Sequence, residues 1–182
     1  MFYRQINEDI AISISIPQYA KELFALTDKN RDYLKQWLPW LNTIAKPSDT
    51  KEFIQLQLQR FAKTEALHAT LFYRGKIAGV LAYNQIDQKN GIGHLGYWLG
   101  KEYTGKGIMF LAVQDMLALG FTDFSLQKVE IRCATGNHKS RAIPEKLNFH
   151  NEGTLRKAEK VNDKWFDHVV YGLLREELEG QK

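Results

Sequence analysis

The residues best placed to do chemistry gather in one stretch, residues 96–120, with the sequence GYWLGKEYTGKGIMFLAVQDMLALG. Its middle, residues 103–107, is the glycine-rich segment YTGKG between a short apolar run and a long apolar one. Two glycines alone often make only a tight connection. At the start of a helix, however, they let successive backbone N–H groups turn toward one point, and such a nest binds anions. The stretch therefore predicts a strand, a loop for a phosphate-bearing ligand, and a buried helix over 108–119 that Gly120 closes.

Two nucleotide-binding motifs nearly match this region, and their context excludes both. Gly100, Gly105 and Lys106 fit the start of G-x-x-x-x-G-K. Gly107 then stands where a phosphate-binding P-loop needs a Ser or Thr hydroxyl for magnesium. Residues 91–96 spell G-x-G-x-x-G, but a strand follows them where the dinucleotide fingerprint requires a helix.

A second informative stretch begins at Asn137 and ends near Phe149. Asn137 can cap a helix that runs to about residue 147, and Asn148 suits the left-handed position that ends a helix. Pro144 falls inside this helix. A proline there removes one hydrogen bond and crowds the carbonyl group of Ser140, so a local kink is expected.

Together these stretches resemble the GNAT N-acetyltransferases. The family's acyl-CoA loop has Arg or Gln, two residues, Gly, one residue, then Gly or Ala, and the string EYTGKG at 102–107 resembles the form common in the RimJ/RimL branch. That branch acetylates the N-termini of ribosomal proteins. The resemblance covers residues 10–174 and implies an α/β domain with a twisted mixed sheet (an α+β mixed sheet). This sheet would open between strands 95–99 and 128–135 to admit acetyl-CoA, without a metal.

The resemblance also assigns residues to the co-substrate acetyl-CoA. It implies that the pyrophosphate lies on the backbone of residues 105–109 and that the thioester oxygen meets N–H groups near Leu99. The residues placed at acetyl-CoA in this way are Tyr97, Trp98, Leu99, Gly105, Lys106, Gly107, Ile108, Met109 and Asn137.

Acetyl transfer to an amine needs a neutral amine, donors for the oxyanion and a proton for the departing thiolate. Many GNAT enzymes supply that proton from a tyrosine at the position of Pro144, and proline cannot do so. The resemblance leaves Ser140 as the acid and gives Glu159 as the base, acting through water. Ser140 can also serve only as a backbone partner near a helix start. The carboxylates of Glu152, Asp163 and Asp167 are rivals to that of Glu159.

Trp37 and Trp40 belong to an irregular Trp-Leu-Pro-Trp turn, because Pro39 disfavours helix at the residue before it. They either plug the core or, as the resemblance implies, flank the acceptor cleft. The implied acceptor is a primary amine, most simply the N-terminus of a ribosomal protein. Polyamine and antibiotic acetyltransferases share these motifs, and a non-catalytic acyl-CoA-binding or interaction module would keep the same fold. A homodimer is consistent with the resemblance.

Composition narrows the class of protein. With 182 residues, 44% of them hydrophobic, we expect a single domain over 1–182. A net charge of +4 without a long basic run does not indicate nucleic-acid binding. No stretch approaches membrane-spanning length and the first twenty residues lack a signal-peptide core, so we expect a cytoplasmic protein. Cys133 is the single cysteine and is expected to be a buried structural thiol.

The remaining pattern predicts the elements that position these residues. A half-buried strand is expected over 10–16, from alternating isoleucines, and a frayed tail over 176–182. Ser48 or Asp49 is expected to cap a helix that runs to residue 64. Further strands are predicted at 68–73, 76–85, 93–99, 128–135, 152–159 and 165–174, and further helices at 19–26, 30–37 and 137–147.

Overall fold

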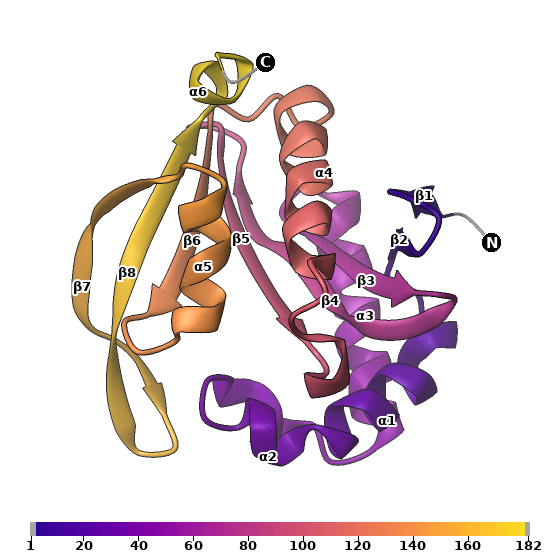
Figure 1. Cartoon of the computed structure of the whole chain (residues 1–182). Helices are drawn as coiled ribbons and strands as arrows, with labels where there is room; N and C mark the ends of the chain where they lie inside the picture. Colours follow the sequence, from indigo (N-terminus) through magenta and orange to yellow (C-terminus); the bar gives the residue numbers. More distant parts are fainter. Residues whose placement is uncertain (1–2, 181–182) are drawn as a thin grey trace.

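The computed structural model describes residues 3–180 and contains one eight-stranded sheet in the order β1-β2-β3-β4-β5-β6-β8-β7 (Figure 1). The strands are β1 (Arg4–Gln5), β2 (Ile10–Ile14), β3 (Leu67–Tyr73), β4 (Lys76–Asp87), β5 (Ile92–Leu99), β6 (Lys128–Ala134), β7 (His150–Val161) and β8 (Lys164–Leu174). The α-helices are α1 (Ala20–Lys29), α2 (Arg31–Leu34), α3 (Pro47–Ala62), α4 (Ile108–Thr122), α5 (His138–Lys146) and α6 (Arg175–Glu179). Short 3-10 turns are η1 (Pro17–Tyr19), η2 (Pro39–Thr43) and η3 (Lys101–Tyr103).

The sheet is mixed, as predicted. Strands β1 to β5 are antiparallel neighbours, β5 and β6 are parallel, and β6, β8 and β7 are again antiparallel. The parallel pair is joined through α4, because parallel neighbours need a crossover connection. The fold is therefore a mixed α/β domain, and the two halves of the sheet meet where β5 and β6 pair.

Two hydrophobic clusters occupy the two faces of the sheet. The larger cluster holds α4 against one face, with Leu81 and Tyr83 of β4 among its members. The smaller cluster holds α1 and α3 against the other face, with Val80 and Ala82 of the same strand. Successive side chains of a strand point to opposite faces, so covering both faces buries consecutive residues. The predicted half-buried strand is for this reason wrong: in β2, Ile10, Ala11 and Ile12 are all buried.

The prediction that Gly120 closes its helix is also wrong. It lies inside α4, which continues to Thr122, so it does not close the helix. The hydroxyl of Tyr83 donates to the carbonyl of Met116 at 2.9 Å, and a Cβ atom at position 120 would collide with that hydroxyl. Glycine is needed here because a buried tyrosine packs directly on the helix backbone.

The start of one helix also differs from the prediction. Helix α3 begins at Pro47, and the carboxylate of Asp49 accepts hydrogen bonds from the N–H groups of Ala45 and Lys46 at 2.9 and 3.0 Å. Asp49 thus caps from the third helical position, and Ser48 is not the cap, because proline favours the first position of a helix.

The predicted frayed tail is wrong over 176–179, which belongs to α6. The carboxylate of Glu177 accepts a hydrogen bond from the N–H of Leu174 at 2.8 Å, which closes a capping box at the start of this helix. Residues 181–182 lie outside the described residues. Within 3–180, no helix is long and apolar enough to cross a membrane.

Candidate active site

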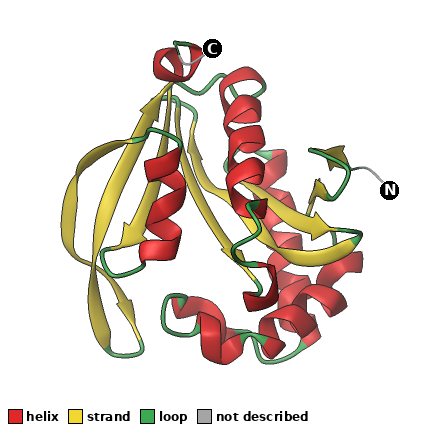
Figure 2. Ribbon diagram, in the orientation of Figure 1, coloured by secondary structure: helices red, strands yellow, loops and turns green. Residues whose placement is uncertain are grey.

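The opening in the sheet lies between β5 and β6. The two strands are paired only from Ile92 to Leu95 on β5 and from Lys128 to Ile131 on β6. Beyond this point β5 stays with β4 and β6 stays with β8, and Figure 2 shows the strands spreading apart. The N–H of Gly100 donates to the carbonyl of Ala78 on β4. Backbone N–H groups of successive residues in a strand point to opposite sides, so those of Tyr97 and Leu99 point away from β4 and toward the opening.

A cleft of about 480 Å³ occupies this opening. Its lining joins α1, the segment 37–44 and α3 on one side to β5, β6, α5 and the β7–β8 hairpin on the other. The predicted site residues that line it are Trp37, Trp40, Tyr97, Trp98, Asn137, Ser140 and Glu159. The structure therefore brings the proposed acid, the proposed base and both turn tryptophans to one cavity.

Ser140 lies in the first turn of α5. Its N–H donates to the side chain of Asn137 at 3.3 Å, so Asn137 is the helix cap that the sequence predicts. The Ser140 hydroxyl lies 3.4 Å from the thiol of Cys133 on β6. Burial raises the pKa of this thiol, as expected for a structural cysteine. Asn148 has φ of 59° and ends the same helix in the predicted left-handed conformation.

Glu159 stands apart from the rival carboxylates. Glu152 pairs with Lys128 at 2.7 Å and Asp163 with Lys160 at 3.1 Å. Asp167 accepts a hydrogen bond from the backbone of residue 157 at 2.7 Å. Among the residues described, Glu159 is the one carboxylate in the lining of the cleft. Position therefore favours it over its rivals as a base.

His168 is a residue of the cleft that the sequence analysis missed. Its Nε2 lies 3.3 Å from the carboxylate of Glu159, and it lines the same cavity. The signal that could have found it is the hairpin turn at Asn162 and Asp163, both at positive φ. This turn pairs Glu159 with Phe166, and residue 168 shares a face with residue 166.

The aromatic turn packs across the open end of the cleft. Trp37 meets Phe166 of β8 edge-on, with ring centroids 5.8 Å apart, and Trp40 lies 6.2 Å from Trp98 of β5. The side chain of Asn162, at the tip of the β7–β8 hairpin, donates to the backbone of residue 35 at 2.8 Å. The turn thus connects the two halves of the opened sheet.

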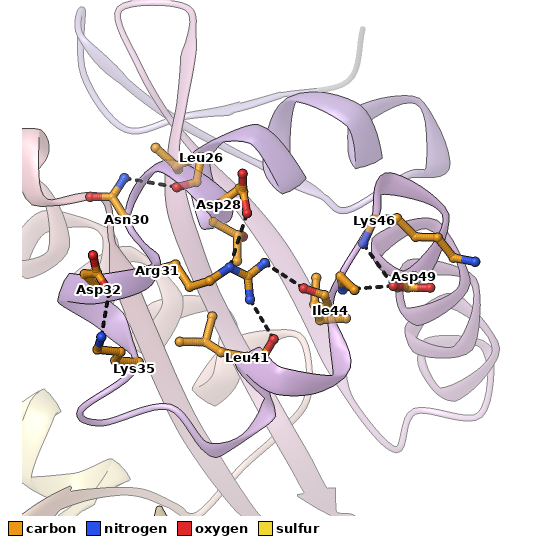
Figure 3. Close-up of polar contacts among 12 residues, drawn as sticks. Leu26, Asp28, Asn30, Arg31, Asp32, Lys35, Leu41, Ile44, Lys46 and Asp49 are labelled. Atoms are coloured by element: carbon orange, nitrogen blue, oxygen red, sulfur yellow. Dashed lines mark hydrogen bonds and ion pairs between the residues drawn. The ribbon is translucent and has the colours of Figure 1, made fainter. Parts of the chain in front are cut away.

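Arg31 holds this turn in place, as Figure 3 shows. Its guanidinium donates to the carbonyl groups of Leu41 and Ile44 at 2.8 and 2.7 Å and to the side chain of Asp28 at 3.2 Å. Three contacts from one planar cation fix the course of the chain between α2 and α3. The segment with Trp40 is therefore an anchored wall of the cleft.

His68 lies at the α3 side of the cleft, on β3. It is 8% exposed, its Nδ1 lies 2.7 Å from the hydroxyl of Ser15, and its ring meets Phe53 edge-on at 5.1 Å. Burial lowers the pKa of His68 to about 4, so the ring is neutral at physiological pH. The sequence analysis did not identify it as part of the cleft.

The glycine loop lies outside this lining, at the start of α4. Gly105 and Gly107 have φ of 77° and 73°, both are exposed, and no atom lies within 4 Å of a Cβ built on either. No side chain caps α4 at its first turn. The side chains of Ile108 and Met109 are buried in the core, so these two residues offer a ligand only their backbone N–H groups.

Lys106 and Glu102 frame the loop. The ammonium group of Lys106 lies 5.3 and 5.9 Å from the ring centroids of Tyr73 and Tyr103. Glu102 pairs with Lys29 of α1 at 2.6 Å, and the hydrogen bond from that lysine lowers the pKa of the carboxyl group. The glutamate that replaces the usual Arg or Gln therefore ties the loop to α1.

Comparison with known proteins decides the family. The acetyltransferase (GNAT) domain matches residues 16–150. This chain belongs to the GNAT family. Among GNAT proteins, YdaF of Bacillus subtilis (strain 168), provisionally named a ribosomal N-acetyltransferase, is 35% identical over the whole of both chains. The ribosomal-protein-serine acetyltransferase of Escherichia coli (strain K12) is 26% identical over 92% of this chain and 93% of its own.

Solved structures agree with this assignment. The microcin C7 self-immunity acetyltransferase MccE, solved with acetyl-CoA and AMP, has a TM-score of 0.89 at 30% identity, over 93% of this chain and 94% of its own. A RimL ribosomal L7/L12 α-N-protein acetyltransferase in complex with coenzyme A has a TM-score of 0.93 at 23% identity, over 97% and 99% of the two chains, and supports the fold. The protein is an acetyl-CoA-dependent N-acetyltransferase. Within the described part of the chain, no three His, Cys, Asp or Glu side chains are grouped to hold a metal ion.

Proposed function

We propose that this GNAT enzyme acetylates the N-terminal amine of a protein, most simply a ribosomal protein. The observation that carries the proposal is one cleft that holds Ser140 and Glu159 in the split of the sheet and opens beneath an anchored aromatic turn. The names of YdaF and of the E. coli relative support the ribosomal acceptor. Such an acceptor would place the enzyme in the cytoplasm. The homodimer stays a prediction, which sedimentation would test.

For acetyl-CoA we propose two points of contact. The unpaired N–H groups at the start of α4, with Gly105 and Gly107 on either side of Lys106, would hold the pyrophosphate. The pantetheine arm would then run into the opening beside β5. The N–H of Leu99, which points into this opening, would donate to the thioester oxygen as negative charge develops there. Tyr97, Trp98 and Asn137 would contact the arm or its acyl group from the cleft lining.

In the proposed reaction, the amine nitrogen attacks the thioester carbonyl, and the C–N bond forms as the C–S bond breaks. The carboxylate of Glu159 takes the proton of the amine through a water molecule. The hydroxyl of Ser140 gives its proton to the departing thiolate and regains one from solvent. Each of these positioned proton transfers typically contributes a factor of about 10² to 10⁴ in rate.

A second acceptor class has one observation in its favour. MccE, at 30% identity over nearly the whole chain, is a self-immunity enzyme solved with AMP, which is not a protein N-terminus. Trp37, Trp40 and Trp98 give this cleft several flat faces on which a planar group could stack. A small-molecule amine, such as a polyamine or an amine that carries a planar group, is therefore the alternative to a protein acceptor.

One experiment separates these acceptors. The purified enzyme is incubated with labelled acetyl-CoA and a lysate of ribosomal proteins, and in parallel with polyamines and aminoacyl nucleotides. Mass spectrometry then locates the label. We expect acetyl groups on the N-terminus of one or a few proteins. Label confined to small amines would overturn the protein acceptor, and binding of acetyl-CoA without any product would overturn the proposed activity toward these acceptors.

A further inference from the structure

One backbone hydrogen bond is missing from α5 next to Ser140. In a helix, the carbonyl of residue 140 accepts a hydrogen bond from the N–H of residue 144. Residue 144 is Pro144, which is buried inside the helix and has no N–H to donate. The carbonyl of Ser140 thus loses its ordinary intrahelical partner, and an unpartnered buried carbonyl would be costly.

Tyr97, on the other side of the opening between β5 and β6, supplies the missing hydrogen bond. Its hydroxyl donates to the carbonyl of Ser140 at 2.8 Å. Tyr97 belongs to β5 beyond Leu95, where β5 has already separated from β6. Its side chain therefore reaches across the opening of the sheet and connects β5 to the first turn of α5.

With this contact, the N–H, the hydroxyl and the carbonyl of Ser140 each have a partner. The N–H of Ser140 bonds to Asn137 at 3.3 Å, its hydroxyl lies 3.4 Å from Cys133, and its carbonyl accepts from Tyr97. The first two contacts hold Ser140 to its own helix and to β6. Among these contacts, the one from Tyr97 fixes it relative to β5, the strand beside which the thioester is proposed to lie.

We propose that Tyr97 is a positioning residue, whose hydroxyl holds the first turn of α5 against β5 so that the Ser140 hydroxyl faces the departing thiolate. The inference rests on the proposed role of Ser140 as the acid. Tyr97 is not itself the acid, because its own proton is engaged by the Ser140 carbonyl. Burial also raises the pKa of Tyr97 well above its ordinary value, which makes it a poor proton donor.

The test uses the proline as well as the tyrosine. Tyr97→Phe keeps the ring and removes the hydroxyl, and a hydrogen bond of this kind contributes about 0.5 to 1.5 kcal/mol, so kcat should fall by a factor of roughly 2 to 10. The dissociation constant for acetyl-CoA should stay unchanged, because phenylalanine keeps the ring and the backbone that would contact the pantetheine arm. Pro144→Ala restores an N–H at residue 144, which can partner the Ser140 carbonyl from within α5 but cannot tie α5 to β5, so in the Tyr97→Phe background kcat should stay low. Tyr19→Phe, which removes a buried hydroxyl that donates to Ser13 at 3.4 Å, is the control and should leave kcat unchanged.

The outcomes are distinguishable. In a Ser140→Ala background, Tyr97→Phe should cause no further loss of kcat, because the tyrosine acts through the serine. An equal loss in both backgrounds, or recovery of most of the lost kcat with Pro144→Ala, would overturn the inference and leave the role of Ser140 standing. Full kcat in Ser140→Ala alone would overturn the acid itself, and the inference with it. Melting temperatures of all variants separate these effects from unfolding.

Discussion

The glycine loop before α4 and the cleft between β5 and β6 are proposed to serve the same reaction, but they are built in opposite ways. The loop is a run of neighbouring residues, and its geometry comes from two glycines at positive φ and from helix N–H groups. The cleft is assembled from segments more than a hundred residues apart, between Trp37 and His168. A backbone site depends on local conformation, whereas a side-chain site depends on the register of distant strands.

The largest effect should follow from breaking the loop. Replacement of both Gly105 and Gly107 by valine should abolish binding of acetyl-CoA, because the left-handed conformation costs an ordinary residue roughly 1 to 2 kcal/mol and is worse for a β-branched one. Acetyl-CoA at about one hundred times its dissociation constant should stabilise the native enzyme by ~2.7 kcal/mol, seen as a rise in melting temperature. The double variant should show no rise.

Gly75 provides a matched control for this prediction. It lies in the turn between β3 and β4 with φ of 76°, and, as at Gly105, nothing surrounds its Cβ position. Gly75→Val imposes the same kind of backbone strain away from the loop, so it should lower the melting temperature but keep the rise with acetyl-CoA. If Gly75→Val also loses the rise, global strain rather than the nest explains the result.

The second prediction concerns the side-chain site. Ser140→Ala should lower kcat by a factor of about 10² to 10⁴, the range for a positioned acid, with the acetyl-CoA dissociation constant unchanged. Steady-state kinetics and calorimetry measure the two quantities. Ser48→Ala, an exposed serine on α3, serves as the control. Near-full kcat in Ser140→Ala would show that the serine only partners the backbone and that the thiolate takes its proton from water.

A smaller and pH-dependent loss is expected for the base. Glu159→Gln should lower kcat at neutral pH and recover part of it above about pH 8, where an N-terminal α-amine loses its proton without help. Glu152→Gln and Asp163→Asn remove rival carboxylates that pair with lysines outside the cleft, and both should keep the native pH–rate profile. A Glu159→Gln profile parallel to that of the native enzyme at every pH would contradict a role in deprotonation.

The same contrast explains what the sequence could predict. Positive φ at Gly105 and Gly107 and the cap at Asn137 depend on neighbouring residues, and all three were predictable from local chemistry. Gly120 was misjudged because its partner, Tyr83, lies on another strand. His168 was missed because its place beside Glu159 depends on counting the register from a hairpin turn.

Two further features lay beyond any local rule. The contacts of Arg31 with the carbonyls of Leu41 and Ile44 depend on how the chain folds back after α2, and no spacing indicates it. The bond from Tyr97 to Ser140 joins residues 43 positions apart. The sequence showed that Pro144 removes an N–H donor, but it could not show which side chain would donate to the Ser140 carbonyl instead.

The last prediction tests whether the cleft and the loop respond separately to pH. Because burial lowers the pKa of His68 to about 4, the unfolded chain, with a histidine pKa near 6.5, binds a proton that the folded chain does not between these values. The contribution of His68 to the free energy of unfolding is therefore greatest above pH 6.5, and it should fall by roughly 1 kcal/mol per pH unit as the pH falls toward 4.

His68→Asn, whose amide can still meet Ser15, should flatten this dependence of the unfolding free energy on pH, measured by urea unfolding. His150→Asn on exposed β7 should not. The rise in melting temperature with acetyl-CoA at pH 7.5 should be the same in all three proteins, because none of the contacts proposed for acetyl-CoA involves His68 or His150. A His68→Asn variant with the native slope would show that other groups govern the acid sensitivity, and a reduced rise with acetyl-CoA would show that the two sites are coupled.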